Sequence, residues 1–297
     1  MKVGLIDVDS HNFPNLTLMK LSAYHKSLGD AVEWCNPLDH YDRVYQSKVF
    51  DETYSPDIDW YPNADEIIKG GTGYGLDNKL SDEVEHIYPD YSLYPELTKD
   101  TAYGFLTRGC PRACKFCIVS EKEGRYSRKV ADLDEFWRRQ KNIKLLDPNL
   151  LACRERIALL EQLVKSKAYV DFTQGLDIRL TSFEVIELIN SIKLRGIHFA
   201  WDNAKDDLTR HFQRYAKRAR HRPHGSYGTV YVLTNFGSTM EENLYRIYTL
   251  RDFGFDPYVM VYDKPNAPKG IKALQRWCNN RAIFKSCPDF KDYGGIT

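Results

Sequence analysis

The sequence lacks any run of about 18–20 consecutive apolar residues, the length that a transmembrane helix requires. It also has little net charge, because 42 Lys and Arg balance 41 Asp and Glu. A balance this close gives no overall electrostatic reason to bind nucleic acid. The first nine residues are too acidic, and their apolar run is too short, for a secretory signal peptide. We therefore expect a cytoplasmic protein that has no membrane partner.

Tandem repeats and low-complexity tracts are absent as well. The 42% hydrophobic and 13% aromatic content supports a folded core rather than a disordered chain. A length of 297 residues suits one large α/β domain or two ordinary ones. The seven cysteines are an odd number, and in a cytoplasmic protein we expect them to be reduced rather than to form a disulfide framework.

The first part of the chain alternates strand-like and helix-like patterns. Hydrophobic periodicity predicts a helix over residues 16–28, which ends at Gly29. Strands are expected over residues 2–8, 31–34, 43–50 and 64–68. This alternation favours a parallel sheet and an α/β fold. We expect residues 1–76 to form a small doubly wound, Rossmann-like domain, and residues 77–99, rich in Asp, Glu, Pro and Tyr, to be a linker.

The second part of the chain, residues 100–297, repeats the alternation. Strands are expected over residues 102–107, 142–147, 168–173, 197–202, 229–234 and 258–263. Helices are expected over residues 132–140, 151–166, 182–194, 239–252 and 270–280, and a capping box marks the start of 239–252. Six such repeats are fewer than the eight of a closed barrel, so a partial barrel with a carboxyl-terminal extension fits the count.

Three cysteines form a cluster directly after the 102–107 strand. Cys110, Cys114 and Cys117 have the spacing Cys-x3-Cys-x2-Cys, at a carboxyl end where α/β barrels place their chemistry. A structural zinc site usually takes four protein ligands, often from two paired knuckles, and the chain has no second knuckle. Inert buried cysteines rarely gather on one loop. The spacing favours a 4Fe–4S cluster in which one iron has no protein ligand.

On this loop, with Phe116 just before its third cysteine, the chain resembles the radical SAM superfamily. The resemblance implies a partial (β/α)6 barrel, a 4Fe–4S cluster held by the three cysteines, and S-adenosylmethionine bound to the open iron. It further implies reductive cleavage of S-adenosylmethionine and hydrogen abstraction from a substrate that the sequence does not identify. An external electron donor such as flavodoxin or ferredoxin is implied as the partner.

Other cofactor contacts are expected at the carboxyl ends of later strands. Besides Phe116, the candidates are Asp147, Asn149, Gln174, Asp177, Arg179, Asp202 and Asn235. In the family, a stretch after the second strand binds the methionine amino group, which points to Asp147 and Asn149; the alternative is a helix N-cap. Arg179 is a candidate for the methionine carboxylate, and the alternative is a local salt bridge to Asp177.

The first domain resembles the cobalamin-binding-like domain of one branch of that superfamily. Residues 9–14 read Asp-Ser-His-Asn-Phe-Pro, which matches Asp-x-His of the branch's Asp-x-His-x-x-Gly motif and replaces its glycine by proline. The glycine-rich residues 70–73 resemble a loop that approaches a nucleotide tail. A polar loop residue is the alternative for His11, so cobalamin is left open and is not predicted.

A basic segment runs from Arg210 to Arg222 with six Arg or Lys and no acidic residue. One interpretation is a phosphate-contacting RNA surface on which Phe212 and Tyr215 stack with bases; the other is a solvated basic helix. An RNA-modifying methyltransferase or methylthiotransferase of the same superfamily is therefore an alternative function. A non-catalytic zinc or cluster-binding interaction module is the alternative outside enzymes.

Overall fold

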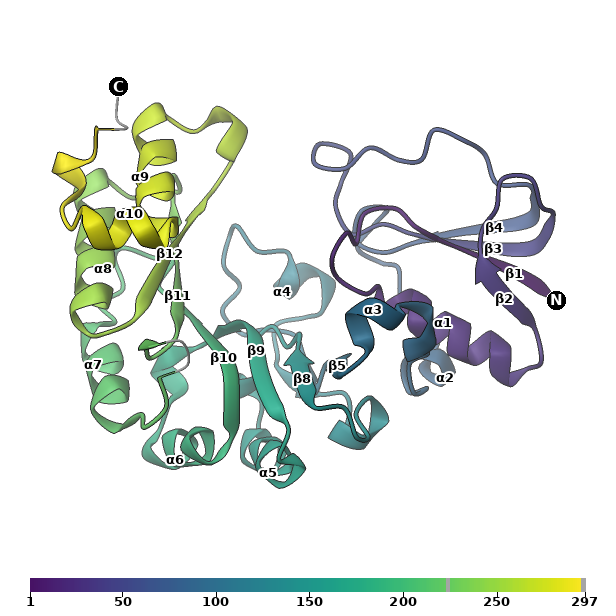
Figure 1. The fold of residues 1–297 in the computed structure, drawn as a ribbon, viewed down its shortest axis with the longest axis horizontal. Helices are drawn as coiled ribbons and strands as arrows, with labels where there is room; N and C mark the ends of the chain where they lie inside the picture. Colours follow the sequence, from purple (N-terminus) through teal and green to yellow (C-terminus); the bar gives the residue numbers. More distant parts are fainter. Residues whose placement is uncertain (223–224, 295–297) are drawn as a thin grey trace.

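The computed structural model describes residues 1–222 and 225–294. Within them the chain forms a four-stranded and a six-stranded sheet, both parallel, and a short antiparallel pair. Figure 1 shows the two parallel sheets as separate bodies joined by the segment that contains α2 (Asp82–Glu85) and α3 (Pro95–Thr98), with a 3-10 turn, η1 (Tyr91–Leu93), between them. The α/β class and the parallel sheets expected from the sequence are confirmed.

The four-stranded sheet has the order β2-β1-β3-β4. Its strands are β1 (Lys2–Asp7), β2 (Ala31–Trp34), β3 (Tyr41–Ser47) and β4 (Ala64–Gly70). Helix α1 (Leu16–Ser27) connects β1 to β2, and the side chain of Asn15 caps it by accepting a hydrogen bond from the backbone N–H of Leu18. The other two connections, residues 35–40 and 48–63, contain no helix. The second helical layer of a doubly wound sheet is therefore absent, because these connections lack a helical apolar pattern.

The six-stranded sheet has the order β12-β11-β10-β9-β8-β5, so its strands follow one another in chain order. They are β5 (Thr101–Gly104), β8 (Asn142–Leu145), β9 (Tyr169–Leu176), β10 (Lys193–Ala200), β11 (Thr229–Thr234) and β12 (Asp256–Val261). Strands β6 (Thr107–Arg108) and β7 (Arg128–Lys129) pair antiparallel and close the cysteine-bearing loop. The expected strand 102–107 is thus divided between β5 and β6.

Helices follow most strands of the larger sheet and lie on one side of it (Figure 1). They are α5 (Arg156–Ser166), α6 (Phe183–Ser191), α7 (Thr209–Arg218), α8 (Met240–Asp252), α9 (Lys269–Asn279) and α10 (Arg281–Ser286). The expected helix 132–140 is wrong, because only a 3-10 turn, η2 (Leu133–Glu135), forms there. Phe136 then packs so closely on Gly104 that a β-carbon on the glycine would lie 2.3 Å from its ring. This tertiary contact overrides the local helical pattern.

The two faces of the larger sheet differ in character. Alternate residues such as Val170, Phe172, Phe199 and Val232 are buried in one core under the helices. Their neighbours point to the opposite face. We call this the open face, and it carries Tyr103, Lys144, Asp171, Thr173, His198, Tyr231, Tyr258 and Met260. Polar and aromatic side chains thus line the face that the helices leave uncovered.

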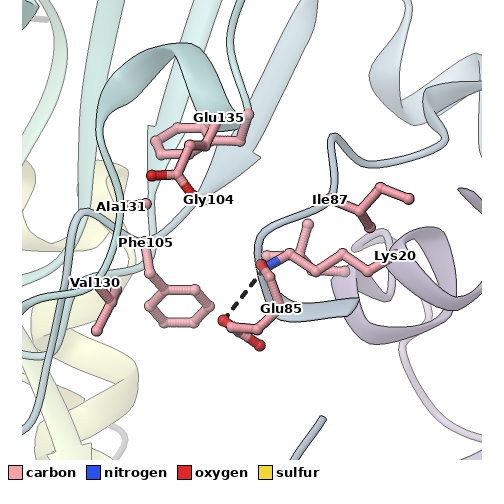
Figure 2. A pocket seen from close by; sticks show the side chains of 10 residues that line it. Lys20, Glu85, Ile87, Gly104, Phe105, Val130, Ala131 and Glu135 are labelled. Atoms are coloured by element: carbon pink, nitrogen blue, oxygen red, sulfur yellow. Dashed lines mark hydrogen bonds and ion pairs between the residues drawn. The ribbon is translucent and has the colours of Figure 1, made fainter. Parts of the chain in front are cut away.

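The smaller sheet and the linker contact the larger sheet through α2 (Asp82–Glu85) and the β1–α1 loop. Lys20 of α1 pairs with Glu85 at 3.2 Å beside Phe105, around a hollow of about 10 Å³ (Figure 2). That volume holds one water molecule at most. The hollow is therefore a small gap in the packing between the two sheets and not a ligand site. Phe13 packs edge-on against Tyr103, with ring centroids 5.3 Å apart, and thereby covers part of the open face.

Among residues 1–222 and 225–294, no helix has both the length and the apolar character needed to cross a lipid bilayer.

Candidate functional site

The three clustered cysteines lie on a loop between β6 and β7, just beyond the carboxyl end of β5. The backbone N–H of Cys110 donates to the carbonyl of Gly124 at 3.1 Å, and that of Cys117 donates to the carbonyl of Cys114 at 3.0 Å. Gly109 has a φ of +85°, a conformation that favours glycine. The loop is therefore closed on itself by backbone hydrogen bonds and turned at a glycine.

Charged side chains fix the base of the loop. The Glu123 carboxylate accepts from the backbone N–H of Gly109 at 3.1 Å and pairs with Arg108 at 2.9 Å. Arg108 also pairs with Glu85 of α2 at 3.2 Å. Short helix α4 (Val119–Lys122) lies in the same loop, and the ammonium of its Lys122 hydrogen-bonds the hydroxyl of Thr72. The loop is thus attached to both the linker and the smaller sheet.

The thiols of the loop are free and lie close enough to affect one another electrostatically. Burial raises the pKa of the Cys114 thiol, and Asp202, Cys117 and Cys110 add to the increase. Burial also raises the pKa of Cys117, with further contributions from Cys110 and Asp202. In the described part of the chain, no three His, Cys, Asp or Glu side chains are arranged to hold a single metal ion.

Two residues expected to contact a cofactor after β8 have other partners. Asp147 is buried, and its carboxylate accepts from the Thr107 backbone N–H at 2.5 Å and the Thr107 hydroxyl at 2.7 Å. Burial raises the pKa of Asp147 to about 6, although the Thr107 donors oppose the shift. Asn149 is also buried and donates from Nδ2 to the Cys110 sulfur at 3.5 Å. Both residues act on the cysteine loop, and neither forms the side-chain N-cap that is the alternative to a cofactor contact.

The residues after β9 form an ion-pair chain that reaches the loop. Arg179 binds Asp177 in a bidentate manner at 2.7 and 3.1 Å, as the local salt-bridge alternative requires. Its remaining nitrogen pairs with Asp206 at 3.2 Å, and Asp206 lies 3.4 Å from Arg112 of the loop. Gln174 is exposed, and its side chain has no hydrogen bond to any residue that the structure describes. Arg179 therefore lies at the edge of the loop, whereas Gln174 has no visible role there.

Asp202 lies near the cysteines, and burial raises its pKa to about 6, with Arg246 and Arg179 opposing the shift. Arg246 is wholly buried, a residue that the sequence analysis missed. Its guanidinium donates to the carbonyls of Trp201 at 2.6 Å, Asp202 at 3.1 Å and Leu233 at 3.0 Å. It thus ties the carboxyl ends of β10 and β11 together. The sequence feature that could have identified it is an arginine at a core-facing position of the helix predicted over residues 239–252.

Aromatic side chains from three loops meet beside the cysteines. Phe116 packs edge-on against Phe236 with centroids 5.5 Å apart, and Phe236 packs on Tyr262 at 4.8 Å. Asn235 donates from Nδ2 to the Tyr262 carbonyl at 2.8 Å. The loops after β11 and β12 are therefore joined to the cysteine loop through ring contacts. Phe116 and Asn235 hold this wall together, and Phe236 and Tyr262 are partly exposed on it.

The β1–α1 loop places His11 on the surface with a φ of +47°. Asp9, the other residue of the Asp-x-His match, is buried and accepts from the backbone N–H groups of Val49 and Phe50, each at 2.8 Å. Its carboxylate is thus occupied in holding the loop after β3. His11 has no hydrogen bond within the described residues, so it is the one titratable group of this match left exposed.

The basic segment lies in α7 up to Arg218 and continues as a loop to Arg222, and its two aromatic residues do not face solvent. Phe212 and Tyr215 are buried among Phe199, Trp201 and Phe255, with Phe212 5.1 Å from Phe255 between ring centroids. The interpretation in which they stack on RNA bases is wrong, because a helix with a charged outer face turns its apolar residues toward the core. The arginines and the lysine of the segment are exposed.

Comparison with models of known protein families finds no match, and no curated protein sequence matches the chain.

Proposed function

We propose that this chain is a radical SAM enzyme whose three loop cysteines hold a 4Fe–4S cluster at the open carboxyl end of a partial (β/α)6 barrel. The observation that carries the proposal is the position of the cysteine loop relative to the larger sheet. A loop with three mutually interacting thiols follows the first strand of a six-stranded parallel sheet whose strands run in chain order. When bound, such a cluster supplies the electron that cleaves the sulfonium of S-adenosylmethionine.

The donor set fits a cluster better than a single ion. Three thiolates are soft ligands that suit iron–sulfur centres. A structural zinc ion usually takes four protein ligands, whereas the loop supplies three cysteines. A cubane takes one thiolate on each of three irons and leaves the fourth iron open. A zinc-binding interaction module is the alternative, and metal analysis of the protein distinguishes it from the iron–sulfur enzyme.

The surrounding residues have supporting roles in this proposal. Asn149 orients the Cys110 sulfur through its N–H donor. Arg112 and Arg179 lie at the edge of the loop, and the methionine carboxylate of S-adenosylmethionine would take the place of Asp206 to pair with them. Phe116 and Phe236 form an apolar wall that excludes water from the radical chemistry.

The smaller unit is proposed to correspond to the cobalamin-binding-like domain of this superfamily. Its parallel sheet and the exposed His11 at the end of β1 support that correspondence. The loop that carries His11 also bears Phe13, which packs on Tyr103 of the larger sheet. Cobalamin binding through His11 is an open extension, and spectroscopy of the chain with hydroxocobalamin, compared with H11A, tests it independently of the cluster.

The decisive experiment is anaerobic reconstitution with iron and sulfide, followed by reduction with S-adenosylmethionine. We expect about four irons per chain, the content of one cubane, and formation of 5′-deoxyadenosine. C110A, C114A and C117A should each abolish the iron–sulfur absorbance and the cleavage. The half-buried Cys287, outside the loop, gives the matched control C287A, which should retain both. Stoichiometric zinc without cleavage would contradict the proposal and favour the interaction module.

A further inference from the structure

A second polar pocket lies on the open face of the larger sheet, away from the cysteines. It has a volume of about 200 Å³ and lies between the amino-terminal parts of β9, β10, β11 and β12. The cysteine loop follows the carboxyl end of β5, so the two sites are at opposite ends of a parallel sheet. The volume equals that of about seven water molecules, enough for a small metabolite.

The pocket contains a carboxylate that lacks a partner. The Oδ1 atom of Asp171 is buried and accepts no hydrogen bond from any described residue. The nearest cationic candidate, Nδ1 of His198, is 3.8 Å away, and it donates instead to the Phe172 carbonyl at 2.8 Å. Because that bond fixes the proton on Nδ1, a neutral His198 presents Nε2 as an acceptor. A buried carboxylate oxygen without a donor is costly, and a ligand that donates to it would offset that cost.

Local backbone features place this carboxylate. A β-carbon at Gly196 would lie 2.6 Å from Asp171 Oδ1, so the missing side chain leaves room for it. The pairing of β9 with β10 shifts between Leu194 and Gly196, which makes Arg195 the extra residue of a β-bulge. Bulges redirect side chains and are frequent near functional sites. The bulge and the glycine together put Arg195 and Asp171 at the same pocket.

Most of the N–H donors of the Arg195 guanidinium are available to a ligand. Its guanidinium donates to Asn142 Oδ1 at 2.9 Å, which uses one of five N–H groups. The other charged pair of the pocket, Arg281 and Asp256, is satisfied internally at 2.9 Å. The four charges sum to zero, and among described residues Asp171 and Arg195 form no ion pair with each other. A simple anion would satisfy only Arg195, and a simple cation only Asp171.

We propose that this pocket binds a small free α-amino acid, with its ammonium on Asp171 and its carboxylate on the Arg195 guanidinium. A neutral zwitterion compensates both open charges at once, and carboxylate recognition by arginine is bidentate. This inference does not rest on the cysteine cluster.

The test measures the melting temperature of the full chain with each common L-amino acid in turn. An amino acid that binds should raise the Tm by a few degrees at a concentration of ~100 times its Kd. D171N and R195Q should abolish this shift, while D252N and R210Q, matched changes on the exposed surfaces of α8 and α7, should retain it. D171N removes a carboxylate without hydrogen bonds, so we expect it to fold with an unchanged or higher Tm.

Derivatives of the same amino acid identify the groups that are recognised. Its N-acetyl and carboxamide forms should not raise the Tm, since each lacks one of the two charges. No shift with any amino acid would overturn the proposal, and so would an equal shift with propionate, which would indicate an anion site at Arg195. A shift retained in the C110A/C114A/C117A variant supports the pocket whatever becomes of the cluster. Loss of the Tm shift in this triple variant would place the ligand at the cysteine loop and refute the assignment of the ligand to the pocket.

Discussion

The carbonyl oxygen of Tyr126 occupies the space where a β-carbon of Gly109 would stand, only 2.1 Å from that position. The contact joins the two ends of the cysteine loop across the β6–β7 pair. Gly109 also has a φ of +85°, so both its conformation and its surroundings require glycine. The residue directly before Cys110 is therefore fixed by packing as well as by backbone torsion.

G109A should consequently destabilise the protein more than a replacement that meets torsional strain alone. Gly124, at φ +95° in the same loop, provides that control, because the nearest atom to its β-carbon position is 4.0 Å away. We expect G109A to lower the free energy of unfolding by about 3 kcal/mol and G124A by about 1 kcal/mol. Urea unfolding of the two variants measures the difference. Equal losses would show that the Tyr126 contact is unimportant.

Arg246 should be essential to the carboxyl ends of β10 and β11. R246M keeps most of the buried volume but leaves the carbonyls of Trp201, Asp202 and Leu233 without their donor. We expect a loss of about 3–5 kcal/mol in unfolding free energy, because several buried acceptors become unsatisfied. R210Q, on the exposed side of α7, should change it by less than about 0.5 kcal/mol. A small effect of R246M would mean that water replaces the guanidinium.

Asp147 should make stability depend on pH in a direction opposite to that of most carboxylates. Burial raises its pKa from 3.8 to about 6 in the folded protein. The folded state therefore retains a proton that the unfolded state loses, and this contribution to stability is lost as pH rises from about 4 to 6. D147N cannot ionise. The wild type should thus lose up to about 3 kcal/mol relative to D147N across this window, whereas a constant difference would contradict the shifted pKa.

Much of the fold follows from local sequence patterns, and the departures have tertiary causes. The strands at residues 31–34 and 229–234 form as predicted. Strand β10 begins four residues before the predicted start at 197, because the bulge at Arg195 lets pairing with β9 continue. The 102–107 strand divides because Asp147 binds the backbone N–H of Thr107 and turns the chain toward β7. Such contacts join residues far apart in sequence, so periodicity does not reveal them.

The candidate site was predictable only where its functional residues lie close together in the sequence. The spacing of Cys110, Cys114 and Cys117 identifies their loop without structural information. The bond from Asn149 to Cys110 and the anchoring by Arg246 each join separate elements, and polar residues in those positions have many alternative partners. The unpaired carboxylate of Asp171 was likewise not predictable, because nothing in the sequence indicates that an aspartate on a strand will lack a hydrogen-bond donor.

The segment Arg210–Arg222 allows stability and RNA binding to be separated. F212A should lower the unfolding free energy by about 3–5 kcal/mol, because this buried ring contacts Trp201 and Phe255. The triple change R214Q/K217Q/R218Q alters only the exposed side of α7 and should leave the Tm close to that of the wild type. If the chain binds RNA, only the triple variant should weaken that binding at constant fold and reduce its salt dependence. Wild-type stability in F212A would contradict the burial of this ring and return base stacking to consideration.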